Sequence, residues 1–375
     1  MRYVSLFSGI EAASVAWGPL GWEPVAFAEI EPFCCAVLAE RLPNVPNLGD
    51  VAKTDWSEYA GSVDVVVGGS PCQSFSIAGR REGLAGASGL MWEYVRAVRE
   101  IRPRWLVWEN VPGALSSSGG EDFRCLLLEL DALGYGLAWD VLDAQFFGLA
   151  QRRERLFVVG RLGDVGRAAE VLFEPEEMRW DNPPSRAKRQ ELALAARAGA
   201  GGDGGRDSAG VLAFDTTQVT SPRNGSNPQF GDPCHTLSAA AHVPVIAFNA
   251  GNANDVACAG AGPEGLCPTL RSSPSGTNQV PVIAFSRDVS GSRGGPSPDS
   301  GPSAVTDGYV VRRLMPVECE RLQGFPDGWT RVPWRGKPAE ECPDTPRYKA
   351  LGNSMAVPVM RWIGERIAMV EEAAR

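Results

Sequence analysis

The sequence predicts an α/β protein with a doubly wound, mostly parallel sheet and a smaller β-rich domain. Short apolar or β-branched runs recur through residues 1–162, and stretches of helical character separate them, as in a sheet with crossover helices. The character of the sequence changes from about residue 181, and residues 199–308 are dense in Gly, Pro, Ser and Asn, which indicates a second domain. With 375 residues, 44% of them apolar, the chain is long enough to form both cores.

Six strands are expected in the first part, each an apolar run bounded by turn residues. They are Tyr3–Phe7, Pro24–Ala28, Val63–Val67, Trp105–Trp108, Leu137–Leu142 and Leu156–Gly160. The helices expected between them are Glu31–Leu42, which has Pro32 in its first turn, Met91–Ile101 and Glu121–Leu133. Two further helices are expected near the end of the chain, at Pro316–Gln323 and Ser354–Ala374. The second should return to the large domain, which we expect to comprise residues 1–178 and 346–375.

The small domain is expected to comprise residues 179–345 and to contain three degenerate repeats near 211–308. An apolar tetrad recurs as VLAF at 211–214 and as VIAF at 245–248 and 282–285, a spacing of 34 to 37 residues. The first two tetrads are followed by CHTL at 234–237 and CPTL at 267–270. We interpret the tetrads as strands of similar β-rich units. A flexible insert with chance echoes remains the alternative.

Composition excludes several classes of protein. No run of about 18 apolar residues exists and the start lacks a signal-peptide layout, so we expect a protein without membrane spans, located in the cytoplasm. Nine cysteines without CxxC pairs and only two histidines argue against a zinc site, a disulfide scaffold or a Ser/His hydrolase. The net charge of −9 lowers the expectation of nucleic-acid binding, but a local basic cleft on an acidic body would permit it.

Three acidic or glycine-containing turns suggest a nucleoside-containing cofactor. The segment SLFSGIEAAS at 5–14 places a strand, a Gly turn and a helix in succession, which lets a ligand approach the backbone. Glu29 ends the second strand, where a carboxylate can accept hydrogen bonds from ribose hydroxyls, and Asp50 follows in a later turn. An ordinary α/β turn without a ligand is the alternative.

The segment GGSPCQSFSIAG at 68–79 is more specific. It follows an apolar strand and presents Cys72 after Pro71 in a rigid turn, whereas most cysteines of such a chain are small buried hydrophobes. Cysteine is intrinsically very nucleophilic, so we expect Cys72 to be a catalytic nucleophile. The glycine-rich stretch that follows carries Arg80 and Arg81, and we expect it to form a lid with phosphate-binding charge.

Two more charged segments follow strands. Glu109, in the sequence ENVP, is expected to face the same cleft as Cys72 and to act as a proton donor or an anchor for a ring nitrogen. The sequence QRRER at 151–155 precedes the sixth strand and could hold a phosphate or a carbonyl. Taken singly, both would ordinarily be solvated surface.

The order of these segments resembles the bacterial and phage family of cytosine carbon-5 DNA methyltransferases. SPCQSFS, ENVPG and QRRER occur in that order and are closed by RRLMPVECERLQGFPDGW at 312–329 and YKALGNSMAVPV at 348–359. The resemblance covers residues 3–162 and 309–362. One departure lies in the Gly-rich F-x-G-x-G-G of the family, where this chain has Glu11 and Ala12 in place of two glycines.

The resemblance implies a mechanism and a cofactor, S-adenosylmethionine, with no metal. Cys72 would attack carbon 6 of a flipped cytosine, Glu109 would engage ring nitrogen 3 and the exocyclic amine, and Arg155 and Arg153 would lie near the target base. The residues that match the cofactor pocket of the family are Phe7, Gly9, Glu29, Ile30, Asp50, Val51, Asn353 and Ser354.

Double-stranded DNA is the implied partner, and residues 179–345 are the implied target-recognition domain. Phosphate contacts are expected from Arg80, Arg81, Arg152, Arg312 and Arg313, and base contacts from Arg223 and Arg271 in the loops of the repeats. We expect a monomer in a bacterial or phage-infected cell. A cognate restriction nuclease is a further partner that the sequence leaves open.

Three alternatives remain. A methyltransferase of the same fold could act on RNA, although the long repetitive insert favours DNA. An amino-group methyltransferase is suggested by Asp181-Asn182-Pro183-Pro184, but Ser185 stands where that motif requires an aromatic residue. An inactive DNA-binding or immunity protein could keep the fold, but the joint presence of Cys72, Glu109 and Arg155 argues against it.

Overall fold

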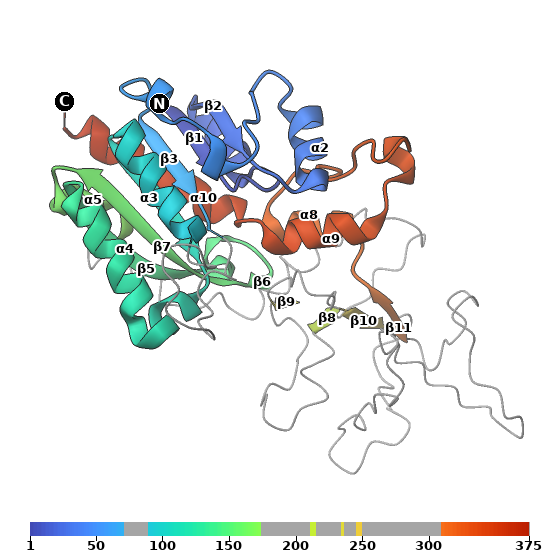
Figure 1. The fold of residues 1–375 in the computed structure, drawn as a ribbon. Helices are drawn as coiled ribbons and strands as arrows, with labels where there is room; N and C mark the ends of the chain where they lie inside the picture. The colour runs from blue at the N-terminus through green and yellow to red at the C-terminus, as the bar shows by residue number, and fades with distance from the viewer. Residues whose placement is uncertain (71–88, 174–210, 215–233, 236–244, 250–308, 375) are drawn as a thin grey trace, which may run out of the picture.

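The computed structural model describes residues 1–70, 89–173, 211–214, 234–235, 245–249 and 309–374 (Figure 1). The large domain is a six-stranded sheet in the order β2-β1-β3-β4-β7-β5. In chain order these strands are β1 (Arg2–Leu6), β2 (Glu23–Ala28), β3 (Val65–Gly68), β4 (Trp105–Asn110), β5 (Tyr135–Asp143) and β7 (Glu154–Leu162). All six predicted strands are present with their ends shifted by no more than two residues, so the doubly wound α/β prediction is confirmed.

Strand β7 is the exception to the parallel arrangement. It pairs antiparallel with β4 on one side and with β5 on the other, whereas β1, β2, β3 and β4 run parallel to one another. The link from β5 to β7 contains only η6 (Ala144–Phe147) and the two-residue strand β6 (Gln151–Arg152). A parallel connection needs a crossover of a dozen or more residues, so this short link forces an antiparallel pair.

Helices cover both faces of the sheet. Because side chains alternate between the two faces along each strand, the strands contribute to two apolar cores. Tyr3 of β1 belongs to the core beneath α1 (Ala12–Trp17), α5 (Val165–Leu172) and α10 (Val357–Glu372). Its neighbour Val4 belongs to the opposite core, beneath α3 (Gly89–Ile101) and α4 (Glu121–Ala132). The predicted helix after β2 is α2 (Pro32–Arg41), and the Glu31 side chain caps it by accepting from the Cys34 N–H at 2.9 Å.

The end of the chain returns to the large domain, as predicted. Helix α10 packs on α1 so closely that a Cβ on Gly364 would lie 2.5 Å from the Trp17 ring, and the Trp17 indole donates to the Met360 carbonyl at 2.7 Å. The single helix expected over 354–374 is shorter: it begins at Val357, with Pro358 in its first turn, and ends at Glu372. A separate helix, α9 (Asp344–Asn353), precedes it and was not predicted, nor was α5.

A three-stranded antiparallel sheet lies outside the large domain, in the order β11 (Tyr309–Arg313), β10 (Val245–Asn249) and β8 (Val211–Phe214) (Figure 1). The first two apolar tetrads are therefore neighbouring strands and pair residue for residue, with Val245 opposite Phe214. The third tetrad lies outside the described residues, so the three repeats and the domain bounds stay a prediction. Helix α8 (Pro316–Gln323) follows β11 with the predicted bounds.

A short strand links the second part of the chain to the large domain. The strand β9 (Cys234–His235), which begins the first CHTL motif, pairs in parallel with β6 and so joins the second part of the chain to the large domain. In the part of the chain that the structure describes, no helix is both long and apolar enough to cross a membrane.

Candidate active site at one edge of the sheet

Several of the predicted site residues meet at one edge of the sheet. Glu29 follows β2, Gly69 and Ser70 follow β3, and Glu109 lies near the end of β4. These are carboxyl ends of parallel strands, which share an edge. Because β7 runs the other way, its first residues reach the same edge, and Arg155 comes to lie beside Glu109.

Glu109 and Arg155 form a largely buried ion pair. Arg155 Nε lies 3.2 Å from Glu109 Oε1, and the two side chains are 15% and 11% exposed. The angles do not make this contact a hydrogen bond, and among the described residues Oε1 has no hydrogen-bond partner. Burial raises the pKa of Glu109, and the charges of Arg155 and Arg153 offset part of that rise. Glu109 can therefore hold a proton more readily than an exposed glutamate and keeps one oxygen available to a ligand.

Arg153 occupies a different position and is only 2% exposed. Its Nη2 donates to the carbonyls of Gly352 at 3.2 Å and Ser354 at 2.6 Å, so it holds the turn between α9 and α10. Its Nε and Nη1 find no hydrogen-bond acceptor among the residues described here. Burial, and then the charge of Arg155, lower the pKa of Arg153. Arg155 therefore contacts Glu109, whereas Arg153 binds the backbone of the C-terminal segment.

The chain that leads to Cys72 passes directly by Glu109. A Cβ on Gly69 would lie 2.8 Å from Glu109 Oε2, so only glycine fits there without displacing the carboxylate. The Asn110 side-chain amide donates to the Ser70 carbonyl at 3.1 Å and fixes the last described residue before the segment that contains Cys72. Asn110 was not singled out from the sequence, since an Asn at a strand end has no distinctive local signal. Cys72 itself lies outside the described residues.

The turn after β1 is strained in a way typical of ligand-binding loops. Phe7, Gly9 and Glu11 all have left-handed backbone angles, with φ of 53°, 55° and 62°. The Glu29 carboxylate holds this turn, because its Oε2 accepts the Gly9 N–H at 2.7 Å. Its Oε1 accepts the N–H groups of Ile30 at 2.9 Å and Glu31 at 2.7 Å. Glu29 therefore organises the backbone of the predicted cofactor pocket, a role that sequence reasoning did not assign to it.

The other predicted cofactor residues differ in accessibility. Ile30 is 69% exposed and offers an apolar surface beside Glu29. Asp50 caps the 3-10 helix Val51–Lys53 by accepting from the Ala52 N–H at 3.0 Å, and Val51 is buried in the core. Asn353 is exposed at the end of α9, and Ser354 is buried with its carbonyl bound by Arg153. Ile30, Asp50 and Asn353 therefore have side-chain surface for a ligand, whereas Val51 contributes mainly packing.

Glu11, one of the two departures from the family pattern, is buried rather than exposed to a ligand. It is 1% exposed, and the Ser14 hydroxyl donates to its Oε2 at 2.6 Å. Ser14 Oγ also lies 2.6 Å from the Tyr3 hydroxyl, which extends the network beneath the turn. Burial raises the pKa of Glu11 to about 7, although hydrogen bonds from Ser14 and Ser5 favour the charged form. The side chain that replaces glycine here therefore points into the core.

The predicted DNA-binding arginines are only partly described. The Arg152 side chain is 58% exposed and lies 3.9 Å from Asp143 and 3.8 Å from Glu154, so its charge is partly compensated. In the backbone pairing of β10 and β11, Arg312 stands opposite Ile246 and Arg313 opposite Val245. The remaining predicted arginines lie outside the described residues; they are Arg80, Arg81, Arg223 and Arg271.

Glu11 should make stability depend on pH. Its pKa is about 7 in the folded chain and near 4.5 when exposed, so between these values the folded state holds a proton that the unfolded state has lost. Stability from this group is therefore full below pH 4.5 and falls as pH rises through 7. Glu11→Gln keeps an acceptor for Ser14 but does not ionise. From urea unfolding, we expect the wild type to lose about 2–3 kcal/mol relative to this variant between pH 5 and 8. If the free energies of unfolding of the wild type and of Glu11→Gln change with pH in parallel, the raised pKa of Glu11 is contradicted.

The chain is similar to a family of known proteins. The family model of the C-5 cytosine-specific DNA methylases matches residues 1–196 and 249–369. A "DNA N-6-adenine-methyltransferase" of Escherichia phage P1 is 36% identical over 97% of this chain, and the chain spans 61% of that relative's length. The "Orphan methyltransferase M.SPRI" of Bacillus phage SPR is 27% identical, with 97% of this chain and 96% of the relative aligned.

Among solved structures, the S. pombe Dnmt2 methyltransferase superposes with a TM-score of 0.57 at 15% identity, covering 100% of this chain and 99% of that one. This likeness shows the fold. The family model extends over well more than half of the chain and includes the strand ends where Glu109 and Arg155 meet. The protein therefore belongs to the C-5 cytosine-specific DNA methylase family.

Proposed function

We propose that the protein transfers a methyl group from S-adenosylmethionine to carbon 5 of a flipped cytosine in double-stranded DNA, through a covalent adduct of Cys72. The observation that supports this most is the buried Glu109–Arg155 pair beside the chain that leads to Cys72. Two residues of chain span at most about 7 Å, so covalent connectivity alone keeps Cys72 close to Ser70. The nucleophile and the carboxyl group that the reaction needs therefore belong to one small region.

The proposed chemistry requires both groups. Carbon 5 of cytosine is a poor nucleophile until the Cys72 thiolate bonds to carbon 6 and the electrons of the ring shift toward nitrogen 3. Glu109, with a raised pKa and an Oε1 without a hydrogen-bond partner among the described residues, is suited to protonate or hydrogen-bond that nitrogen. After methyl transfer, loss of the carbon 5 proton breaks the bond from sulfur to carbon 6. The base must be flipped out of the duplex to reach these groups.

The residues after β1 and β2 fit an adenosine-containing methyl donor. An ionised carboxylate has about four acceptor sites, and Glu29 uses three of them for backbone N–H groups, which leaves one for a ribose hydroxyl. The exposed Ile30 side chain provides an apolar surface for a planar base beside that carboxylate. When bound, S-adenosylmethionine would supply an activated methyl group on a sulfonium. No metal is required for this transfer.

Methylation of the adenine N6 amine is the second candidate, favoured by the printed name of the phage P1 relative. An amino nitrogen needs no covalent activation by a thiolate, so that activity would leave Cys72 without a role. The match to the cytosine family model and the arrangement of Glu109 favour cytosine. Incubation with labelled donor and duplex DNA, then digestion to nucleosides, distinguishes 5-methylcytosine from N6-methyladenine. A parallel incubation with RNA tests the RNA alternative.

We also propose that residues 179–345 form the target-recognition domain and that the protein acts as a monomer. The pairing of the first two apolar tetrads in one sheet supports a repeated β-rich unit. The contribution of Arg223 and Arg271 to base recognition remains part of this proposal. A cognate restriction nuclease is left open.

Cys72 should become trapped on a modified substrate. In duplex DNA with 5-fluorocytosine at the target, fluorine replaces the proton whose loss releases the enzyme, so we expect a complex that survives denaturation on a gel. Cys72→Ala should abolish this complex, whereas Cys125→Ala, which alters a partly exposed cysteine of α4, should not. A stable complex formed by Cys72→Ala would sink the nucleophile assignment.

Glu109→Gln keeps the size of the side chain but removes the transferable proton and the charge that faces Arg155. We expect single-turnover methylation to slow by about 10² or more, because general acid catalysis typically contributes that much. Binding of S-adenosylmethionine, measured by calorimetry, should change little. A variant that loses donor binding but keeps the rate of the chemical step would place Glu109 in the cofactor pocket instead.

Glu29→Ala should weaken S-adenosylmethionine binding. The change removes one charge-assisted hydrogen bond to ribose, of about 1.5–3 kcal/mol, and also releases the Gly9 N–H that holds the turn. We expect the dissociation constant in calorimetry to rise at least tenfold. Glu40→Ala, on the exposed side of α2, is the matched control and should bind normally. Equal affinities for the two variants would move the pocket away from Glu29.

A further inference from the structure

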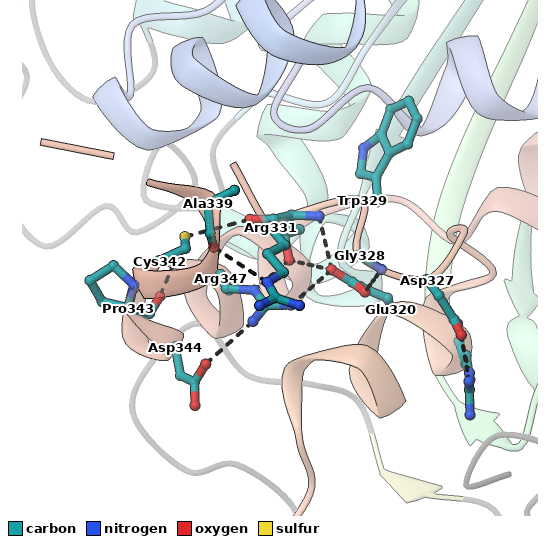
Figure 2. A network of polar contacts seen from close by, with 12 residues as sticks. Glu320, Asp327, Gly328, Trp329, Arg331, Ala339, Cys342, Pro343, Asp344 and Arg347 are labelled. Atoms are coloured by element: carbon teal, nitrogen blue, oxygen red, sulfur yellow. Dashed lines mark hydrogen bonds and ion pairs between the residues drawn. The ribbon is translucent and has the colours of Figure 1, made fainter. Parts of the chain in front are cut away.

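A buried carboxylate organises the loop that follows α8. Glu320 is 0% exposed; its Oε2 accepts the Gly328 N–H at 2.6 Å and its Oε1 accepts the Thr330 N–H at 2.8 Å (Figure 2). Arg347 of α9 completes this side, with Nε donating to Thr330 Oγ1 at 3.0 Å and Nη2 lying 3.3 Å from Glu320. Residues 326–331, called here the Trp329 loop, are therefore fixed from the inside by charge-assisted hydrogen bonds.

The Trp329 loop is also held from the side of α2. Arg41 donates to three of its backbone carbonyls, from Nε to Trp329 at 2.9 Å and from Nη2 to Gly328 at 2.5 Å and Arg331 at 3.0 Å. The Arg41 guanidinium carbon lies 5.7 Å from the centre of the Trp329 ring, within cation–π range. The indole is thus fixed in both position and orientation.

The Trp329 indole reaches the turn that carries the predicted cofactor pocket. Its Nε1 donates to the Ile10 carbonyl at 2.8 Å. Ile10 lies between Gly9 and Glu11, both of which have left-handed backbone angles. Glu29 binds the Gly9 N–H, so two segments distant in the sequence hold neighbouring backbone groups of one turn. Strained turns of this kind persist only when the surrounding structure determines them.

We infer that Trp329 is a positioning residue for the cofactor site, whose indole N–H keeps the turn at residues 9–11 in the conformation that binds the methyl donor. Glu29 restrains the turn by accepting the Gly9 N–H, and Trp329 restrains it by donating to the Ile10 carbonyl. A single hydrogen bond can hold a strained turn only if its donor is itself fixed, and the contacts of Arg41 and Glu320 with the Trp329 loop fix this donor. The inference rests on the proposed function for the identity of the cofactor, but the restraint on the turn does not depend on it.

The test uses Trp329→Phe in the full chain, because phenylalanine keeps an aromatic ring against Phe325 and Arg41 but has no N–H donor. In the cofactor-free protein, we expect amide hydrogen exchange of the peptide that covers residues 7–14 to accelerate by about 5- to 10-fold, the effect of one lost hydrogen bond. The dissociation constant for S-adenosylmethionine in calorimetry should rise by a similar factor. The KM for the donor should rise with it, while kcat and the KM for DNA stay unchanged.

Trp334→Phe is the matched control. Trp334 lies in the same C-terminal segment, and its ring packs edge-on against Phe33 of α2, with the ring centroids 5.3 Å apart. Arg41→Met is the second variant. It retains the Trp329 side chain but removes the hydrogen bonds that hold the Trp329 loop, so it should change the exchange of residues 7–14 and the donor affinity in the same direction as Trp329→Phe. It also decides the question if Trp329→Phe does not fold.

The outcomes separate this inference from the proposed function. If exchange of residues 7–14 in Trp329→Phe, or in Arg41→Met where only that variant folds, equals that of Trp334→Phe, the inference is wrong whatever the protein binds. If the wild type binds no S-adenosylmethionine, the proposed cofactor is wrong, and the exchange result still decides whether Trp329 restrains the turn. Faster exchange with unchanged donor affinity would also overturn the positioning role.

Discussion

The antiparallel direction of β7 is the constraint on which the site depends. Because the link from β5 is too short for a crossover, β7 enters the sheet reversed between β4 and β5, and its first residues reach the edge where β1 to β4 end. Arg155 is thereby brought against Glu109, with Leu156 opposite Asn110 in the register. A parallel β7 would carry the same arginines to the opposite edge, and Glu109 would be buried without a compensating charge.

The site is built from groups that a stable core would avoid. Glu109 and Arg153 are buried with polar atoms that lack hydrogen-bond partners within the described ranges, and Glu11 is buried at a backbone angle that favours glycine. Such features oppose folding unless the rest of the molecule compensates for them. The two apolar cores, one on each face of the sheet, provide that compensation. Because polar atoms without partners and strained turns are suited to a ligand, their concentration at one edge fits the proposed binding of DNA and the methyl donor there.

The C-terminal segment holds two parts of the site through hydrogen bonds. Arg153 binds the carbonyls of Gly352 and Ser354, and the Trp329 indole binds the turn after β1. Helix α10 then closes against α1 through Gly364. Residues more than 300 positions from the first strand therefore hold its loop, which explains why motifs of this family occur at both ends of the chain.

The sequence by itself determined the strands of the large sheet and most of the helices, but not α5 and α9, and it identified the candidate site residues. Apolar runs flanked by turns were enough to place all six strands, and Glu109 and the arginines of QRRER were identified because unusual residue types stand at strand ends. The tertiary structure alone decided the three backbone N–H groups bound by Glu29, the burial of Glu11 and the contact of Trp329 with Ile10. Periodicity along the chain reports which face of an element is buried, since burial follows from local spacing. It carries no information about which distant backbone group a side chain will bind, because that partner is set only when the whole sheet and its helices have packed.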